Sequence, residues 1–113
     1  MIFGQLTTKI INKKFGMELK IGLSTDSYGE RTVYGVSTDN DIGKRASWEF
    51  THQWYLQPVV VNKELLFYII NREYDELLKL SQSPDSDGDR EAFTHGEDAS
   101  GDPERFGWKI ERY

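Results

Sequence analysis

The sequence predicts an all-β protein made of two copies of one unit of four short strands. Three observations favour this fold class. First, a shift of 59 residues aligns ten identical residues within 22 positions, which indicates an internal repeat. Second, runs rich in β-branched and aromatic residues alternate with clusters of turn-forming residues. Third, each copy carries a tryptophan near its last strand, Trp54 in the first and Trp108 in the second.

The repeat is clearest over residues 10–31 and 69–90. Similar residues fill the gaps between the identical ones, with Phe15 on Tyr74 and Tyr34 on Phe93. After a difference of five residues in length, "QWYLQ" at 53–57 aligns with "GWKIE" at 107–111. The identical pairs, each 59 positions apart, are Ile10 and Ile69, Ile11 and Ile70, Asn12 and Asn71, Leu19 and Leu78, Lys20 and Lys79, Ser24 and Ser83, Asp26 and Asp85, Ser27 and Ser86, Gly29 and Gly88, and Arg31 and Arg90.

The first two strands of each unit follow from local patterns. "TKII" at 8–11 and "LFYII" at 66–70 have the composition of strands, and an asparagine suited to a turn follows each of them. "MELKI" at 17–21 then alternates apolar and polar residues, as a strand with one buried face does. Its counterpart is "ELLKL" at 76–80. A helix over 72–82 is the alternative there, because Tyr74, Leu77 and Leu78 would share one face.

The remaining elements come in the same order in both units. The loops "STDSYGER" at 24–31 and "SPDSDGDR" at 83–90 are rich in turn formers. Each precedes a short aromatic strand, "TVYGV" at 32–36 and "EAFTH" at 91–95. A polar loop then leads to the strand that carries the tryptophan.

Units of four strands and about 40 to 60 residues are typical of propeller blades and of β-trefoils. Two blades cannot close a propeller, which needs at least about four. We therefore predict a β-trefoil-like fold with two of its three four-stranded repeats. The length favours a single domain over residues 1–113, with the first repeat at about 8–60 and the second at about 66–113.

Composition excludes several classes of function. The 19 acidic and 14 basic side chains give a net charge of −5, which argues against a nucleic-acid groove because such a groove needs a basic face. Cysteine is absent, so disulfides and thiolate metal sites are excluded. No apolar run is long enough to span a membrane, and the first residues show no signal-peptide pattern.

Catalytic motifs are missing as well. The chain has no Gly-x-Ser-x-Gly elbow, no phosphate-binding glycine loop and no His-Glu-x-x-His, so we expect no enzyme activity and no cofactor. The two histidines, His52 and His95, fall in different repeats. The alternating Asp85, Asp87 and Asp89 resemble calcium ligands, but Gly88 is out of place for an EF-hand. We interpret this stretch as a solvated turn and expect no metal.

The tryptophans and arginines have two interpretations each. Trp54 and Trp108 occupy matching positions, which favours buried anchors of the core. Trp48 has no counterpart in the second repeat, so it is a candidate for glycan stacking or an interface, with packing over the open end of the barrel as the alternative. Arg31 and Arg90 close matching loops, where we expect ion pairs with the matching aspartates of the same loops, or else a polar pocket in each repeat.

A carbohydrate site is the binding hypothesis that these residues support. Trefoil lectins bind sugar hydroxyls with an aspartate beside an aromatic platform. Asp26 with Tyr28 and Tyr34 would offer that arrangement, and Trp48 would add a stacking surface. The repeated Gln-x-Trp signature of those lectins is absent, because Gln53 directly precedes the first matched tryptophan and Gly107 precedes the second.

Taken together, four segments resemble the low-molecular-weight (thirty-kilodalton) lipoproteins of insect haemolymph, the family that includes microvitellogenin. They are "TKIINKKFGMELKIGLSTDSYGERTVYG", "QWYLQPV", "LFYIINREYDELLKLSQSPDSDGDREAF" and "DPERFGWKIERY", and the resemblance runs from about residue 8 to residue 113. It implies an extracellular, non-enzymatic storage protein with a lipid or carbohydrate ligand. Members combine a helical N-terminal domain with a three-repeat trefoil, of which only the second and third repeats match here.

The leading expectation is a secreted haemolymph protein that stores or binds a ligand. The alternatives are a small lectin-like module and a truncated paralogue without a ligand.

Two repeats leave a trefoil barrel with an open edge, and open edges pair with other chains. We therefore expect either self-association through that edge or closure by residues 1–6 and the insertion around Trp48.

Overall fold

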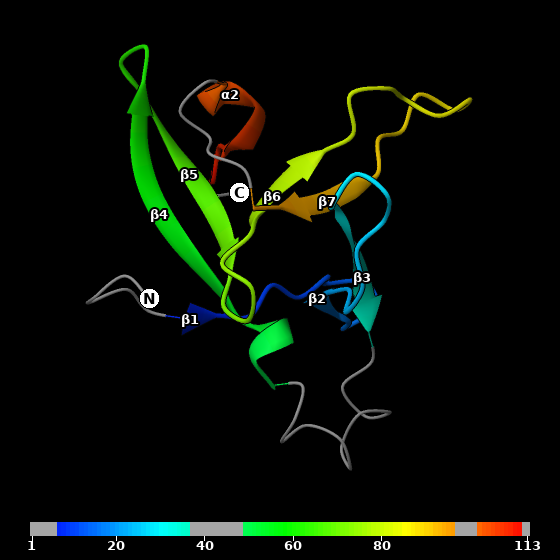
Figure 1. Cartoon of the computed structure of the whole chain (residues 1–113). Helices are drawn as coiled ribbons and strands as arrows, with labels where there is room; N and C mark the ends of the chain where they lie inside the picture. Colours follow the sequence, from blue (N-terminus) through cyan, green and yellow to red (C-terminus); the bar gives the residue numbers. More distant parts are fainter. Residues whose placement is uncertain (1–6, 37–48, 97–101, 112–113) are drawn as a thin grey trace.

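The computed structural model describes residues 7–36, 49–96 and 102–111. These residues form one antiparallel sheet of eight strands in the order β1-β4-β5-β6-β7-β3-β2, with β8 paired to β5. The sheet curls into a half-barrel (Figure 1), and the all-β, trefoil-like prediction is confirmed. The strands are β1 (Thr7–Thr8), β2 (Glu18–Ile21), β3 (Arg31–Val36), β4 (Trp54–Val61), β5 (Glu64–Asn71), β6 (Leu77–Leu80), β7 (Ala92–His95) and β8 (Gly107–Trp108).

The longest hairpin joins β4 to β5, whose residues pair from Trp54 with Asn71 to Val61 with Glu64. Asn62 and Lys63 connect the two strands with φ angles of 51° and 67°. Two successive residues with positive φ are the mark of a tight type I′ turn, whose twist matches that of the strands it joins. This hairpin forms the tall wall of the half-barrel in Figure 1.

Two shorter hairpins, β2–β3 and β6–β7, have the same register under the shift of 59 residues. Leu19 lies opposite Gly35 in the first, and Leu78 lies opposite Thr94 in the second. The strand at Leu77–Leu80 shows that the helical alternative over residues 72–82 was wrong. The chain extends there because Leu78 must reach the core cluster while its neighbours pair across the sheet.

The turn before each of these hairpins is also built alike. The amide of Asn12 donates to the carbonyl of Met17 at 2.9 Å, and that of Asn71 donates to the carbonyl of Glu76 at 2.9 Å. Both asparagines accept a backbone hydrogen bond from within the turn through Oδ1. Asparagine suits this position because its side chain replaces a backbone acceptor in a tight turn.

The core is centred on Trp54, Ile21, Ile69 and Leu78, which come from both units. Trp54 and Ile21 are fully buried. The indole Nε1 of Trp54 donates to the carbonyl of Leu19 at 3.1 Å, so its polar atom is satisfied in the interior, as buried tryptophans require. The prediction of Trp54 as a core anchor is confirmed.

The structure differs from the sequence-based expectations in the segments that precede the tryptophan strands. A 3-10 helix, η2 (Glu49–His52), and a short α-helix, α2 (Pro103–Phe106), stand where polar loops were expected. The first and last strands are shorter than expected, with two residues each. No described helix has the length and apolar character needed to cross a membrane. The division into repeats at 8–60 and 66–113 stays a prediction, and Trp48 lies outside the described residues.

Candidate functional site

Two neighbouring cavities lie on either side of a shared wall that is built mainly by the second unit. The first has a volume of about 460 Å³ and lies between β6, α2 and β8, with Leu80 and Trp108 as its apolar walls. The second has a volume of about 410 Å³, and Tyr28 and Phe93 are its aromatic walls. Both volumes fall in the range of small-molecule sites, which combine apolar walls with a few polar groups.

Three residues line both cavities, namely Ser81, Gln82 and Arg105. Arg105 comes from α2, and its side-chain Nε is buried without a hydrogen-bond partner among the described residues. A buried guanidinium N–H normally has a partner, because leaving one unsatisfied costs free energy. Arg105 therefore stands between the two cavities with its Nε enclosed by the protein and without a hydrogen-bond partner among the described residues.

Arg90 is the second cation of the first cavity. Its Nη1 donates to the carbonyl oxygens of Ser81 and Gln82, so it fastens the loop between β6 and β7. Across residues 7–36, 49–96 and 102–111, no carboxylate forms an ion pair with it. The expected pairing of Arg90 with Asp85 is therefore wrong, because Asp85 Oδ1 instead accepts backbone amides of its own turn, from residues 87 and 89 at 2.9 Å each.

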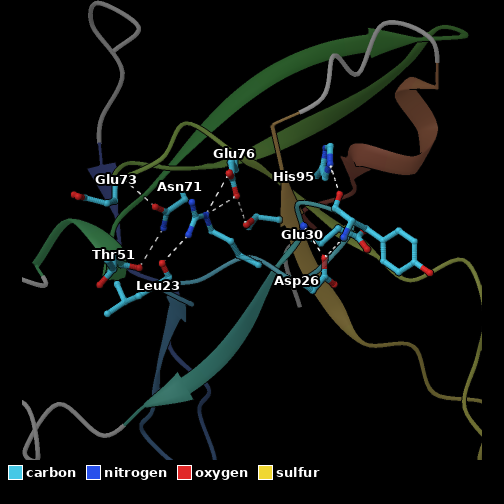
Figure 2. A network of polar contacts seen from close by, with 11 residues as sticks. Leu23, Asp26, Glu30, Thr51, Asn71, Glu73, Glu76 and His95 are labelled. Carbon is cyan, nitrogen blue, oxygen red and sulfur yellow. Dashed lines mark hydrogen bonds and ion pairs between the residues drawn. The ribbon is translucent and has the colours of Figure 1, made fainter.

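The matching Arg31 has a different environment. Its Nε lies 3.3 Å from Glu76, and its guanidinium lies 3.8 Å from the centre of the Tyr74 ring. Its Nη1 also donates to the carbonyl of Leu23 at 2.8 Å, and Figure 2 marks these bonds to Glu76 and Leu23. The expected pair with Asp26 is wrong, because the second unit supplies a carboxylate and a ring that enclose the cation.

The two matched tryptophans also differ in their environment, because one is more buried than the other. Trp108 Nε1 donates to the carbonyl of Leu78 at 3.1 Å, as Trp54 does to Leu19. Trp54 is 0% exposed, however, whereas Trp108 is only half-buried and forms part of the wall of the first cavity. The prediction that both are core anchors holds in full for Trp54 alone, and Trp108 presents part of its ring to the cavity.

The structure describes three of the four predicted sugar-binding residues, and these three do not line one cavity. Asp26 is occupied by its own turn, since its Oδ1 accepts the amides of Tyr28 and Glu30 at 2.8 and 3.0 Å. Tyr28 lines the second cavity. Tyr34 lies on β3 opposite Lys20 and is not in either cavity wall, and Trp48 is outside the described residues.

The acidic turn does bring Asp85, Asp87 and Asp89 together, with one carboxylate oxygen of each within 4.8 Å of the others. All three are exposed. The turn at Asp26 has the same hydrogen bonds but no aspartate at the second and third positions. The side chains of Asp87 and Asp89 are therefore not needed to shape the turn, and the interpretation as a solvated turn stays a prediction.

A buried pair, Glu18 and His52, joins β2 to η2. His52 Nδ1 is 2.9 Å from Glu18 Oε2, and Lys9 Nζ is 3.3 Å from Glu18 Oε1. Burial opposes the ionisation of Glu18, but the hydrogen bonds and charges of His52 and Lys9 outweigh burial and hold the pKa of Glu18 below its ordinary value of 4.5. His95 lies elsewhere, with its Nε2 3.2 Å from the carbonyl of Tyr28.

Sequence reasoning missed Arg105 because the first unit has no basic residue at the matching position. Trp54 and Trp108 are 54 residues apart, and the same shift places Arg105 on Thr51, which is buried. The signal in the sequence was that a charged residue, Arg105, stands where the first unit has a buried residue. The structure shows why this matters, because α2 places Arg105 in the same cavity wall as Arg90.

An all-β half-barrel with two adjoining cavities is the class of structure defined by these features. A family model for the lepidopteran low molecular weight (30 kD) lipoproteins matches residues 8–112, and the chain belongs to that family. It is 44% identical over 102 residues to microvitellogenin of Manduca sexta. It is 33% and 32% identical over 105 residues to low molecular mass lipoproteins 3 and PBMHP-6 of Bombyx mori.

These alignments cover 90% of the chain for microvitellogenin and 93% for the two lipoproteins. In each case the chain spans 38% of the length of the relative. Two of these relatives are named as lipoproteins and none is named as an enzyme, which fits the expected lack of catalytic activity.

Proposed function

We propose that this chain is a non-enzymatic, extracellular member of its family that holds a small amphiphilic ligand in the two adjoining cavities. The observation that carries the proposal is the shared wall of Ser81, Gln82 and Arg105 between two spaces of about 460 and 410 Å³. Apolar and aromatic walls with a few convergent polar groups are typical of small-molecule sites. The lipoprotein names of the relatives support a lipid-like ligand.

Native mass spectrometry of the chain incubated with oleate or with glucose tests the proposal. We expect an oleate adduct at one-to-one stoichiometry. Gln82→Trp should abolish it, because the larger ring fills the junction of the cavities while the Gln82 carbonyl still binds Arg90. Leu23→Trp is the matched control, since residue 23 lies 59 positions earlier and is half exposed. A chain that binds neither compound would contradict the proposal.

Carbohydrate binding is the second candidate function, and Tyr28 and Phe93 in the second cavity favour it because aromatic rings stack on sugars. A glucose adduct without an oleate adduct would identify this function. An extracellular location is tested separately, by immunoblotting cell-free haemolymph and washed cells. Protein confined to the cells would contradict it.

A further inference from the structure

The first unit shows what the fold places against a matched arginine. Arg31 has the carboxylate of Glu76 at 3.3 Å and the ring of Tyr74 at 3.8 Å. Thr94 Oγ1 donates to the same carboxylate at 2.8 Å, which fixes its position. One carboxylate and one ring thus enclose the guanidinium, and the Arg31 side chain is only 15% exposed.

The second unit presents the matching arginine without such a group. Arg90 is exposed, and within the described part of the chain its hydrogen bonds go to two backbone carbonyls. Arg105, in the same cavity wall, has a buried Nε with no partner among the described residues. Lys109 is a third cation there, but Glu64 already holds it at 2.7 Å. Among the described residues of that wall, Asp102 is the acidic one.

We propose that the first cavity binds a carboxylate attached to an aromatic or apolar body. The carboxylate lies between Arg90 and Arg105, and the body lies against Trp108 and Leu80. Planar guanidinium groups bind carboxylates through paired, charge-assisted hydrogen bonds. The partly buried tryptophan ring offers a stacking surface fixed in place by its bond to Leu78.

This inference deepens the proposed function and rests on it, since it names the chemical class of the ligand. Two sources carry the same chemistry. One is a free organic acid, and the other is an acidic, aromatic turn of a polypeptide, of the kind that supplies Tyr74 and Glu76 to Arg31. The experiment must therefore separate the sources as well as test the charge.

Isothermal titration calorimetry with three probes does this. The probes are 3-(4-hydroxyphenyl)propanoate, its uncharged amide, and the acetylated peptide of residues 72–77. We expect the acid to bind about tenfold or more tightly than the amide, because the charge-assisted bonds to arginine are lost in the amide. Arg105→Gln and Arg90→Gln should each remove this preference, whereas Arg105→Lys should keep part of it. Lys13→Gln removes one charge from an exposed turn and should change nothing.

The outcomes separate the two proposals. Equal affinity of acid and amide would overturn the carboxylate site and leave small-ligand binding intact. Binding of the peptide but not of the acid would support the carboxylate site and overturn the small-ligand function. A preference for the acid that survives both arginine-to-glutamine changes, in variants with unchanged thermal unfolding, would overturn the assignment to this cavity.

Discussion

Trp54 donates a hydrogen bond from its indole Nε1 to the carbonyl oxygen of Leu19, at 3.1 Å and in the centre of the core. We expect Trp54→Phe to lower the free energy of unfolding by about 3 kcal/mol, because it leaves a cavity and an unsatisfied carbonyl. Trp108→Phe should cost about 1 kcal/mol, since Trp108 is half-buried. Urea denaturation of both variants checks this, and equal losses would contradict it.

The Asx turns make a second prediction. Asp26 Oδ1 accepts two backbone amides, so Asp26→Ala should lower the free energy of unfolding by about 1 kcal/mol. Asp26→Asn keeps the acceptor oxygen and should cost less than half as much. Asp85→Ala should behave like Asp26→Ala, because the second turn has the same bonds. A neutral Asp26→Ala, measured by thermal and urea unfolding, would show that these bonds do not stabilise the fold.

The pH dependence of stability follows from Glu18. Its pKa lies below the ordinary value of 4.5 in the folded chain, so folding favours the ionised form. The stability gained from this shift is complete above the ordinary pKa and is lost as the pH falls through the folded pKa. We expect Glu18→Gln to flatten the acid limb of the stability curve below about pH 4.5. Urea midpoints between pH 3 and pH 7 would test this, and parallel curves for wild type and variant would contradict it.

The second unit suggests a replacement for this buried pair. Leu77 lies 59 positions after Glu18, and Phe106 lies 54 positions after His52. We expect the double change Glu18→Leu with His52→Phe to be neutral or stabilising, because well-packed apolar residues often replace buried ion pairs without loss. Glu18→Leu alone should cost about 3 kcal/mol, since it leaves His52 buried without its carboxylate. A double variant less stable than the single one would contradict this prediction.

A backbone position gives a fifth test. Asp75 has a φ of 54°, and Gly16, at the matching position of the first unit, has a φ of 65°. Residues other than glycine are strained in this region. Asp75→Gly should therefore raise the thermal midpoint, with a gain of about 0.5 kcal/mol, whereas Gly16→Asp should lower it. A loss of stability in Asp75→Gly would show that the exposed aspartate has another role.

Most of the fold could be predicted from the repeat, because its pattern specifies local structure that does not depend on long-range contacts. The paired Asp26 and Asp85 accept the same two backbone amides of their turns, as their residue type predicts. The paired Asn12 and Asn71 each accept one amide of their own turn, three residues on in the first unit and two residues on in the second. The site was harder to predict. Arg31 finds its carboxylate 45 residues away, and no local pattern marks Glu76 as its partner.

The measurement that tests the central claim most directly is a titration followed by ¹⁵N–¹H NMR of the arginine Nε–H and tryptophan indole signals. Added 3-(4-hydroxyphenyl)propanoate should shift the signals of Arg105 and Trp108 to saturation and leave that of the buried Trp54 unchanged. Signals of Arg105 and Trp108 that stay in place at millimolar ligand would contradict a carboxylate site in this cavity.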